Sequence, residues 1–116
     1  NHPTQIAIAE YMNDASNYSS LPQFFQQKRD LFLNEIKTSK FKWIPTKATY
    51  FQVLDYSEIT NESDLEFAKR LTIENGLASI PLSVFNENSL DEKVLRFCFA
   101  KTDETLLKAA KILNKI

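Results

Sequence analysis

The sequence predicts an α/β domain (an α+β sandwich) in which helices cover one small sheet of mixed or antiparallel strands. Stretches with helical spacing of apolar residues precede and separate short runs rich in β-branched and aromatic residues. The 116 residues suffice for one hydrophobic core but not for two. Hydrophobic residues make up 43% of the chain and charged residues 25%, which is ordinary globular usage and argues against disorder.

Two helices are predicted in the first third of the chain. Pro3 suits the first turn of a helix over 3–13, because this turn leaves its amides unbonded and proline has none to lose. Ser20 and Pro22 open a longer helix over 20–39. Each helix carries an apolar face, made of Ile6, Ala9 and Met12 in the first and of Phe24, Phe25, Leu31, Phe32 and Ile36 in the second.

Strands are predicted at 49–55 and 94–100, where β-branched and aromatic residues occupy both faces. Shorter extended segments are expected at 41–44 and 78–80, each followed by a proline. A sheet of about three main strands is small. We therefore expect it to leave a face or an edge for another domain.

Two further helices complete the pattern. Ser63 and Glu66 match a capping box, in which each side chain accepts a hydrogen bond from the backbone amide of the other residue. Gly76 should end this helix in a left-handed turn. Thr102 caps the last helix, whose acidic residues come first and whose lysines come later, the order that the helix dipole favours.

The composition excludes several classes of function. A net charge of −1 argues against a nucleic-acid partner, and no apolar run approaches the roughly 20 residues that span a membrane. One glycine, Gly76, cannot build a phosphate-binding loop, and one histidine, His2, cannot build a paired-histidine zinc site. The single Cys98 excludes an internal disulfide and favours a reducing compartment, the cytoplasm. No metal site is expected.

Arg96 is the candidate functional residue. It lies in a strand with two apolar faces, so we expect the strand to be central and the guanidinium to be at least partly buried. A buried charge needs a partner. One interpretation pairs Arg96 with a nearby carboxylate such as Asp55 or Glu92. The other pairs it with a substrate anion, because the planar guanidinium matches a carboxylate in a two-pronged pair. The pattern leaves both open.

Other reactive residue types have structural interpretations. Cys98 is expected to be a small core residue, and Lys40 a solvated one. Phe97 and Phe99 are expected in the core, because an RNA-binding sheet would also need a glycine and a basic surface. A group of carboxylates is expected in turns and helix caps, namely Asp55, Glu58, Glu62, Asp64 and Glu66.

Several stretches resemble a known family. The segment 96–106 (RFCFAKTDETL) resembles the closing motif of class I/II pyridoxal-phosphate aminotransferases, and is most similar to their kynurenine, glutamine and methionine branch. In the family's order, 1–12 resembles the helix that enters the small domain, 48–57 its first long strand, and 66–85 its helix, short strand and loop. Ala48 stands where the family usually has glycine, so the backbone there is expected to differ.

The resemblance implies that residues 1–116 are the C-terminal (small) domain of such an enzyme, with the cofactor-binding large domain absent. The chain starts at Asn1 without an initiator methionine, and we expect it to be processed or cut from a longer one. The resemblance also implies that Arg96 binds the substrate α-carboxylate, and that Asn1 lies near the neighbouring subunit's site in a homodimer. It implies no catalytic residue and no cofactor-binding residue in this chain.

The implied cofactor is pyridoxal 5'-phosphate, held by the missing large domain. The intact enzyme would move an amino group between an L-amino acid, aromatic or sulfur-containing, and a 2-oxo acid. One alternative is a carbon–sulfur β-lyase of the cysteine-S-conjugate type with the same fold. The other is an interaction module without chemistry.

Overall fold

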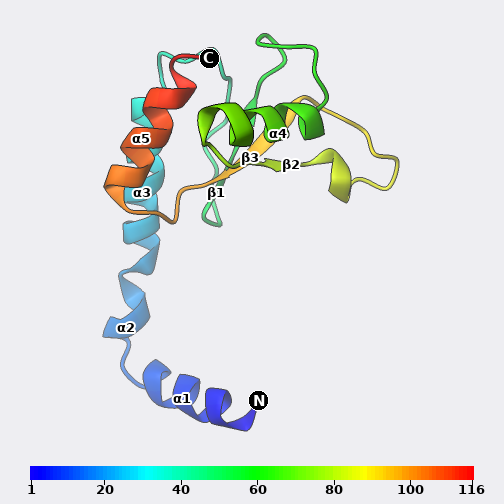
Figure 1. Ribbon diagram of the computed structural model, residues 1–116. Coiled ribbons are helices and arrows are strands. Elements are labelled where there is room, and N and C mark those ends of the chain that lie inside the picture. Colours follow the sequence, from blue (N-terminus) through cyan, green and yellow to red (C-terminus); the bar gives the residue numbers. More distant parts are fainter.

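The computed structural model describes all residues from 1 to 116 and confirms the expected fold class (Figure 1). The elements are α1 (His2–Met12), α2 (Ser16–Ser19), α3 (Leu21–Glu35), β1 (Phe51–Asp55), α4 (Asp64–Asn75), β2 (Ile80–Pro81), the 3-10 helix η1 (Ser83–Phe85), β3 (Val94–Cys98) and α5 (Asp103–Leu113). The capping box of α4 and the left-handed Gly76 that ends it are both present, as predicted. None of the helices combines the length and the hydropathy that a membrane span requires.

The three strands form one antiparallel sheet in the order β1-β3-β2. The central position predicted for the strand of Arg96 is confirmed. Arg96 lies opposite Val53 of β1 and Ile80 of β2. β3 pairs with β1 along its whole length and with β2 at Leu95 and Arg96, so the backbone at Arg96 is held from both sides.

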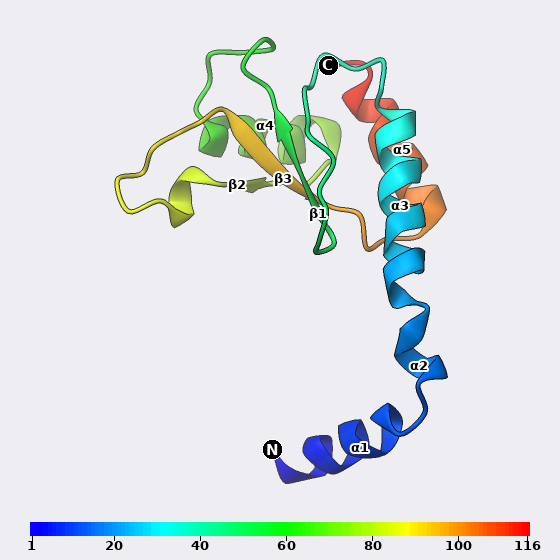
Figure 2. The ribbon, with the colours of Figure 1, turned by 180° about the vertical axis from the view of Figure 1, so that it is seen from behind.

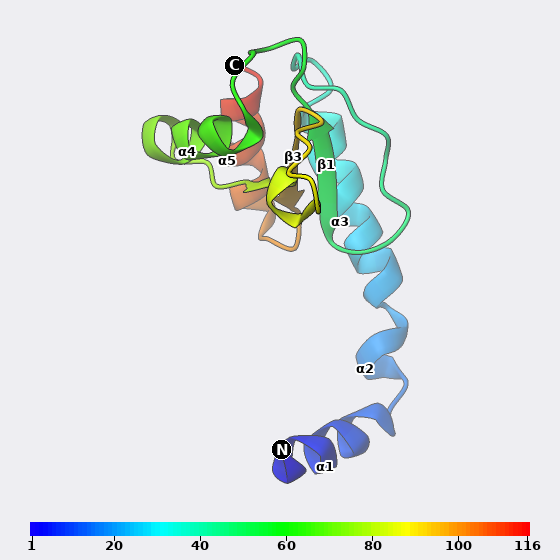
Figure 3. The same cartoon turned by 90° about the vertical axis from the view of Figure 1, so that its right-hand side faces the viewer.

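The core lies against one face of this sheet. Leu54, Leu95 and Phe97 point into it and are at most 4% exposed. The helices α3, α4 and α5 supply Phe32, Leu33, Phe67, Ala68, Leu71, Leu106, Ala110 and Leu113. Residues outside the helices and strands complete the core, namely Ile36, Phe41, Tyr56, Leu77 and Phe99. The other face, which carries Arg96, is only partly covered: Val53 is 39% exposed. Figure 2 shows the sheet from this side with α4 behind it, and Figure 3 shows the sheet nearly edge-on.

Helices α3 and α5 pack against each other although they lie far apart in the sequence. The Lys28 ammonium contacts the Asp103 carboxylate at 2.6 Å, and the Asn114 amide donates to the Glu35 carbonyl at 2.8 Å. The second contact explains why α3 ends at Glu35 and not near residue 39 as predicted. Asn114 satisfies a carbonyl that the helix end leaves free, and the chain turns so that Ile36 enters the core.

All four extended segments differ from their predicted bounds, and β3 ends at Cys98 and not at residue 100. Residues 41–44 form a single bridge, between Lys42 and Asp55, and not a strand. Strand β1 starts at Phe51 because Thr49 has φ +67°, a left-handed conformation that no strand accommodates. This unusual residue follows Ala48, next to the position where the backbone was expected to differ. The extended segment expected at 78–80 becomes β2, Ile80–Pro81.

Residues 1–20 form an arm that leaves the packed body (Figures 1 and 2). No residue of α1 or α2 is buried. Two hydrogen bonds between Tyr11 and Asn17 tie the two helices together, at 3.1 and 2.8 Å. The predicted face of Ile6, Ala9 and Met12 therefore covers nothing within this chain.

Candidate functional site

The Arg96 side chain lies half-buried on the less covered face of the sheet. Its Nε has no exposed surface and no hydrogen-bond partner. Its Nη1 and Nη2 also make no hydrogen bond within the chain, but neither is sealed from solvent. Partial burial of the guanidinium is thus confirmed, and the two outer nitrogens are the ones that a ligand can reach.

Two aromatic rings contact this guanidinium. The Arg96 Cζ lies 4.3 Å from the ring centroid of Phe51 and 5.4 Å from that of Phe85. Phe51 comes from β1 and Phe85 from η1, so the cation is held between two different elements. The negative faces of aromatic rings attract a cation without using its hydrogen-bond donors. The rings can therefore stabilise the guanidinium and leave its fork free.

The other two arginines show what a structurally satisfied guanidinium looks like in this chain. Arg70 donates from Nε and Nη2 to the Glu62 carboxylate, at 2.6 to 3.0 Å. Arg29 binds the Asp30 carboxylate and the Thr46 carbonyl, both at 2.7 Å from its terminal nitrogens. Arg96 has no such acceptor.

The interpretation that paired Arg96 with Asp55 or Glu92 is therefore wrong. The Asp55 carboxylate accepts from the Ser57 amide at 2.7 Å, and Glu92 is exposed and makes no ion pair. The Arg96 Nε, which is sealed from solvent and has no acceptor, is a buried donor left unpaired at a cost to the fold, while Nη1 and Nη2 face solvent. The free Nη1 and Nη2 point to a planar anion such as a carboxylate.

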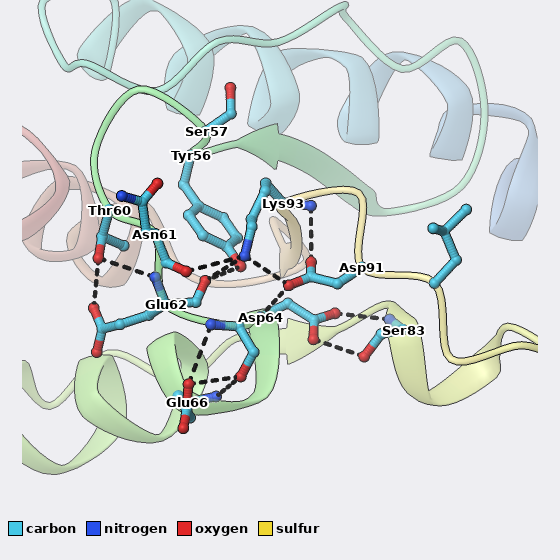
Figure 4. A network of polar contacts seen from close by, with 12 residues as sticks. Tyr56, Ser57, Thr60, Asn61, Glu62, Asp64, Glu66, Ser83, Asp91 and Lys93 are labelled. Carbon is cyan, nitrogen blue, oxygen red and sulfur yellow. Dashed lines mark hydrogen bonds and ion pairs between the residues drawn. The ribbon is translucent and has the colours of Figure 1, made fainter.

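A partly buried polar network holds the segment that carries Phe85, and Figure 4 shows its members Asp64, Ser83, Asp91 and Lys93. Asp64, the first residue of α4, is 1% exposed and accepts from the Ser83 amide and hydroxyl at 2.7 and 2.6 Å. Its own amide donates to the Asp91 carboxylate at 3.1 Å, and Asp91 also pairs with the Lys93 ammonium at 3.0 Å. Asp64 is thus a buried anchor and not only the turn or capping residue that was predicted.

The network also sets the protonation of its members. Burial raises the pKa of the Asp91 carboxyl. Hydrogen bonds from the Lys93 amide and ammonium and from the Asp64 amide lower it, together with the charge of Lys93. The lowering effects are larger in sum, so the pKa of Asp91 lies below its ordinary value. Burial and the nearby carboxylates Asp91, Asp64 and Glu62 raise the pKa of the Tyr56 hydroxyl far above its ordinary value. At neutral pH Asp91 is therefore charged and Tyr56 is not.

Comparison with known proteins identifies the family. The model of aminotransferase class I and II matches residues 1–113. This chain belongs to that family. It is 41% identical to the methionine aminotransferase of Escherichia coli K12, and the match covers 100% of this chain and 30% of that protein. It is 34% identical to human kynurenine–oxoglutarate transaminase 3, over 97% of this chain and 29% of that one.

Solved aminotransferase structures have the same fold. The crystal structure of an Escherichia coli protein with a methionine aminotransferase function superposes with a TM-score of 0.91 at 41% identity, over 98% of this chain and 30% of that one. The N-succinyldiaminopimelate aminotransferase of Mycobacterium tuberculosis gives 0.85 at 28% identity, over 97% and 30%. This aminotransferase chain thus spans about 30% of the length of the relatives it matches.

The remaining candidates lie apart from Arg96. Asn1 caps α1, accepting from the Thr4 amide at 3.4 Å, and lies at the tip of the arm, far from the sheet in Figures 1 and 3. Cys98 is half-buried, so its predicted place in the core is wrong. Phe97 and Phe99 lie in the core as predicted. Lys40 is exposed as predicted, and its ammonium donates to the Ile116 carbonyl at 2.9 Å.

Two features of the site were missed by sequence reasoning. Phe85 was seen only as part of a loop, and Asp64 only as part of a helix start. The available signal for Asp64 was its place directly after the helix cap Ser63, where an aspartate can accept hydrogen bonds from a second segment. The partner Ser83 lies 19 residues away, and nothing local identifies it.

Proposed function

We propose that this chain is the C-terminal (small) domain of a pyridoxal-phosphate-dependent aminotransferase, in which Arg96 binds the α-carboxylate of the substrates. The observation that carries the proposal is the Arg96 guanidinium. It projects from the central strand, is stabilised by two aromatic rings, and has no acceptor among the residues of its own chain. An end-on pair through Nη1 and Nη2 fits this geometry, because Nε is sealed from the ligand side.

We infer a substrate pair of an L-amino acid, aromatic or sulfur-containing, and a 2-oxo acid. The relatives named for methionine and for kynurenine support this class. Both members of the pair carry a carboxylate next to the reacting carbon. One arginine on a rigid strand can therefore orient the donor in one half-reaction and the acceptor in the other.

The residues of this chain do not fit the cofactor. The lysines are exposed except for Lys28 and Lys93, and these two bind the carboxylates of Asp103 and Asp91. The single glycine, Gly76, ends a helix and lines no phosphate cradle. We therefore place pyridoxal phosphate on segments outside this chain. The cofactor, when bound there, stabilises charge at the substrate carbon, and the part of this domain is to orient the substrate.

We further propose that the intact enzyme is a cytoplasmic homodimer of amino-acid metabolism. Asn1 lies at the tip of a projecting arm and not near the Arg96 of its own chain, which supports a place close to the neighbouring subunit's site. A half-buried, unpaired Cys98 suits a reducing compartment.

The test is Arg96→Lys in the full-length protein. This change keeps the charge but removes the planar fork. One charge-assisted hydrogen bond is worth about 1.5–3 kcal/mol, so kcat/KM for the amino acid should fall roughly 10- to 150-fold. The decarboxylated amine has no carboxylate to lose, so its kcat/KM should stay nearly constant. The measurement is the ratio of the two kcat/KM values.

Arg70→Lys is the matched control, because Arg70 binds a carboxylate of its own chain. It should lower stability without changing the preference for the amino acid. If Arg96→Lys leaves that preference intact, Arg96 is structural and the proposed function of this residue is wrong.

A further inference from the structure

Phe85 is an exposed aromatic residue whose position needs an explanation. Its ring is 64% exposed and does not belong to the hydrophobic core or to the residues packed against it. It nevertheless lies over the Arg96 guanidinium, with 5.4 Å between the ring centroid and Cζ. Burial does not hold the ring there, so the backbone of η1 must set its position.

That backbone is fixed by Asp64. The Asp64 carboxylate is almost completely buried, and its hydrogen bonds come from the amide and hydroxyl of Ser83, the first residue of η1. No lysine or arginine pairs with it. Burying a carboxylate without a counter-ion is costly, and the cost is offset only by strong, well-aligned hydrogen bonds. Because the buried Asp64 carboxylate depends on these two hydrogen bonds, they hold Ser83 and the start of η1 in place.

The other end of the loop returns to the same point. Asp91 accepts from the Asp64 amide, the Lys93 amide and the Lys93 ammonium, at 2.8 to 3.1 Å. Both ends of the segment 83–91 are thus tied to the first residue of α4, as Figure 4 shows for Ser83 and Asp91. Phe85 lies between these two ends in the sequence. The next residues along the chain enter β3, which carries Arg96.

We propose that Phe85 is a positioning residue for Arg96, and that Asp64 acts through Ser83 to hold it over the guanidinium. The ring restricts the orientation of the guanidinium plane and shields it from water, while Nη1 and Nη2 stay free for the carboxylate. This inference rests on the proposed function of Arg96. It assigns the η1 loop a role in substrate affinity, although no residue of that loop needs to contact the substrate.

The test is Phe85→Leu in the full-length protein. An exposed cation–π contact corresponds to roughly 2- to 5-fold in binding, so KM for the amino acid should rise by about that factor. The value of kcat should change less, because the contact between Arg96 and the carboxylate is weakened in the ground state and the transition state alike. KM for the decarboxylated amine should not move. Phe85→Tyr keeps an aromatic ring at this position and should therefore have the KM of the wild-type protein.

Asp64→Asn and Val84→Ala complete the design. Asp64→Asn weakens the tie to Ser83 and should raise the same KM while it also lowers the melting temperature. Val84 is 56% exposed on the same short helix and has no aromatic ring to offer the guanidinium, so Val84→Ala should change neither quantity. In an Arg96→Lys background, Phe85→Leu should add little further loss, because the two residues act as one unit.

Failure of this inference differs from failure of the proposed function. If Arg96→Lys removes the preference for the amino acid but Phe85→Leu leaves KM unchanged, or if Phe85→Tyr does not restore it, the positioning role is wrong and Arg96 keeps its own. If Arg96→Lys leaves the preference intact, both fall together.

Discussion

Helices α1 and α5 have the same length, 11 residues, and opposite relations to the rest of the chain. In α5 the apolar side chains gather on one side, and Leu106, Ala110 and Leu113 are buried in the core. In α1 apolar side chains occur on several sides, and none is buried: Ile6, Ile8, Tyr11 and Met12 are 48 to 56% exposed.

The difference shows which of the two helices is covered by the core of this chain. A helix with one apolar side needs one neighbour, and the core of this domain supplies it to α5. A helix that is apolar on several sides needs neighbours on several sides, and exposed apolar patches of this kind mark interaction surfaces. We therefore expect α1 to be stabilised by protein outside this chain, while residues 21–116 hold together on their own.

The largest expected effect is the difference in stability between a substitution in α5 and one in α1. Leu113→Ala removes a completely buried side chain and should lower the free energy of unfolding of this chain by about 2–5 kcal/mol. Ile8→Ala, on α1, should change it by less than about 0.5 kcal/mol. Urea denaturation of both variants gives the comparison. Equal losses would show that α1 belongs to the same cooperative unit as α5.

A second comparison uses two aspartates whose pKa values both lie below the ordinary value of 3.8. In the arm, hydrogen bonds from the Ser16 hydroxyl and amide lower the pKa of Asp14. In the body, the bonds from Lys93 and Asp64 lower that of Asp91 against the effect of burial. A carboxylate with a lowered folded-state pKa stabilises the fold at neutral pH, and this contribution is lost as the pH falls through the folded pKa.

We expect Asp91→Asn to reduce the dependence of the unfolding free energy on pH below about pH 5. Asp14→Asn should leave that dependence unchanged, because the arm does not contribute to the core whose unfolding is measured. Thermal melts at several pH values measure both slopes. A change in slope with Asp14→Asn would mean that the arm unfolds together with the body.

The smallest expected effect on stability comes from removing the arm. A chain that starts at Ser20 should keep its unfolding midpoint within error, because no residue of α1 or α2 is buried. Its self-association should weaken, since the arm carries much of the exposed apolar surface. Analytical ultracentrifugation over a range of concentrations compares the two chains. If the 116-residue chain is monomeric at high concentration, the arm does not mediate self-association.

The sequence predicted the features whose signals are local. Ser63 and Glu66 are three residues apart, so the cap of α4 could be recognised without knowledge of the fold. The two apolar faces around Arg96 predicted its central strand for the same reason. The family resemblance predicted the fold and the candidate arginine together.

The features that escaped prediction depend on contacts between distant segments. The end of α3 is decided by Asn114, which lies 79 residues away, and the place of Phe85 by the contact between Asp64 and Ser83. The free guanidinium of Arg96 is also a property of the fold. Asp55 instead accepts from the Ser57 amide, and Glu92 is exposed and makes no ion pair.

The pairing of α3 with α5 has a consequence for the folding of the chain during its synthesis on the ribosome. The apolar face of α3 is synthesised early, but the partner residue Leu113 emerges 78 positions after Glu35. At 5–20 residues per second, this face waits roughly 4–16 s for its partner. During that time the part of the core that α5 supplies, Leu106, Ala110 and Leu113, is missing. We therefore expect the apolar face of α3 to stay partly uncovered until α5 has been synthesised.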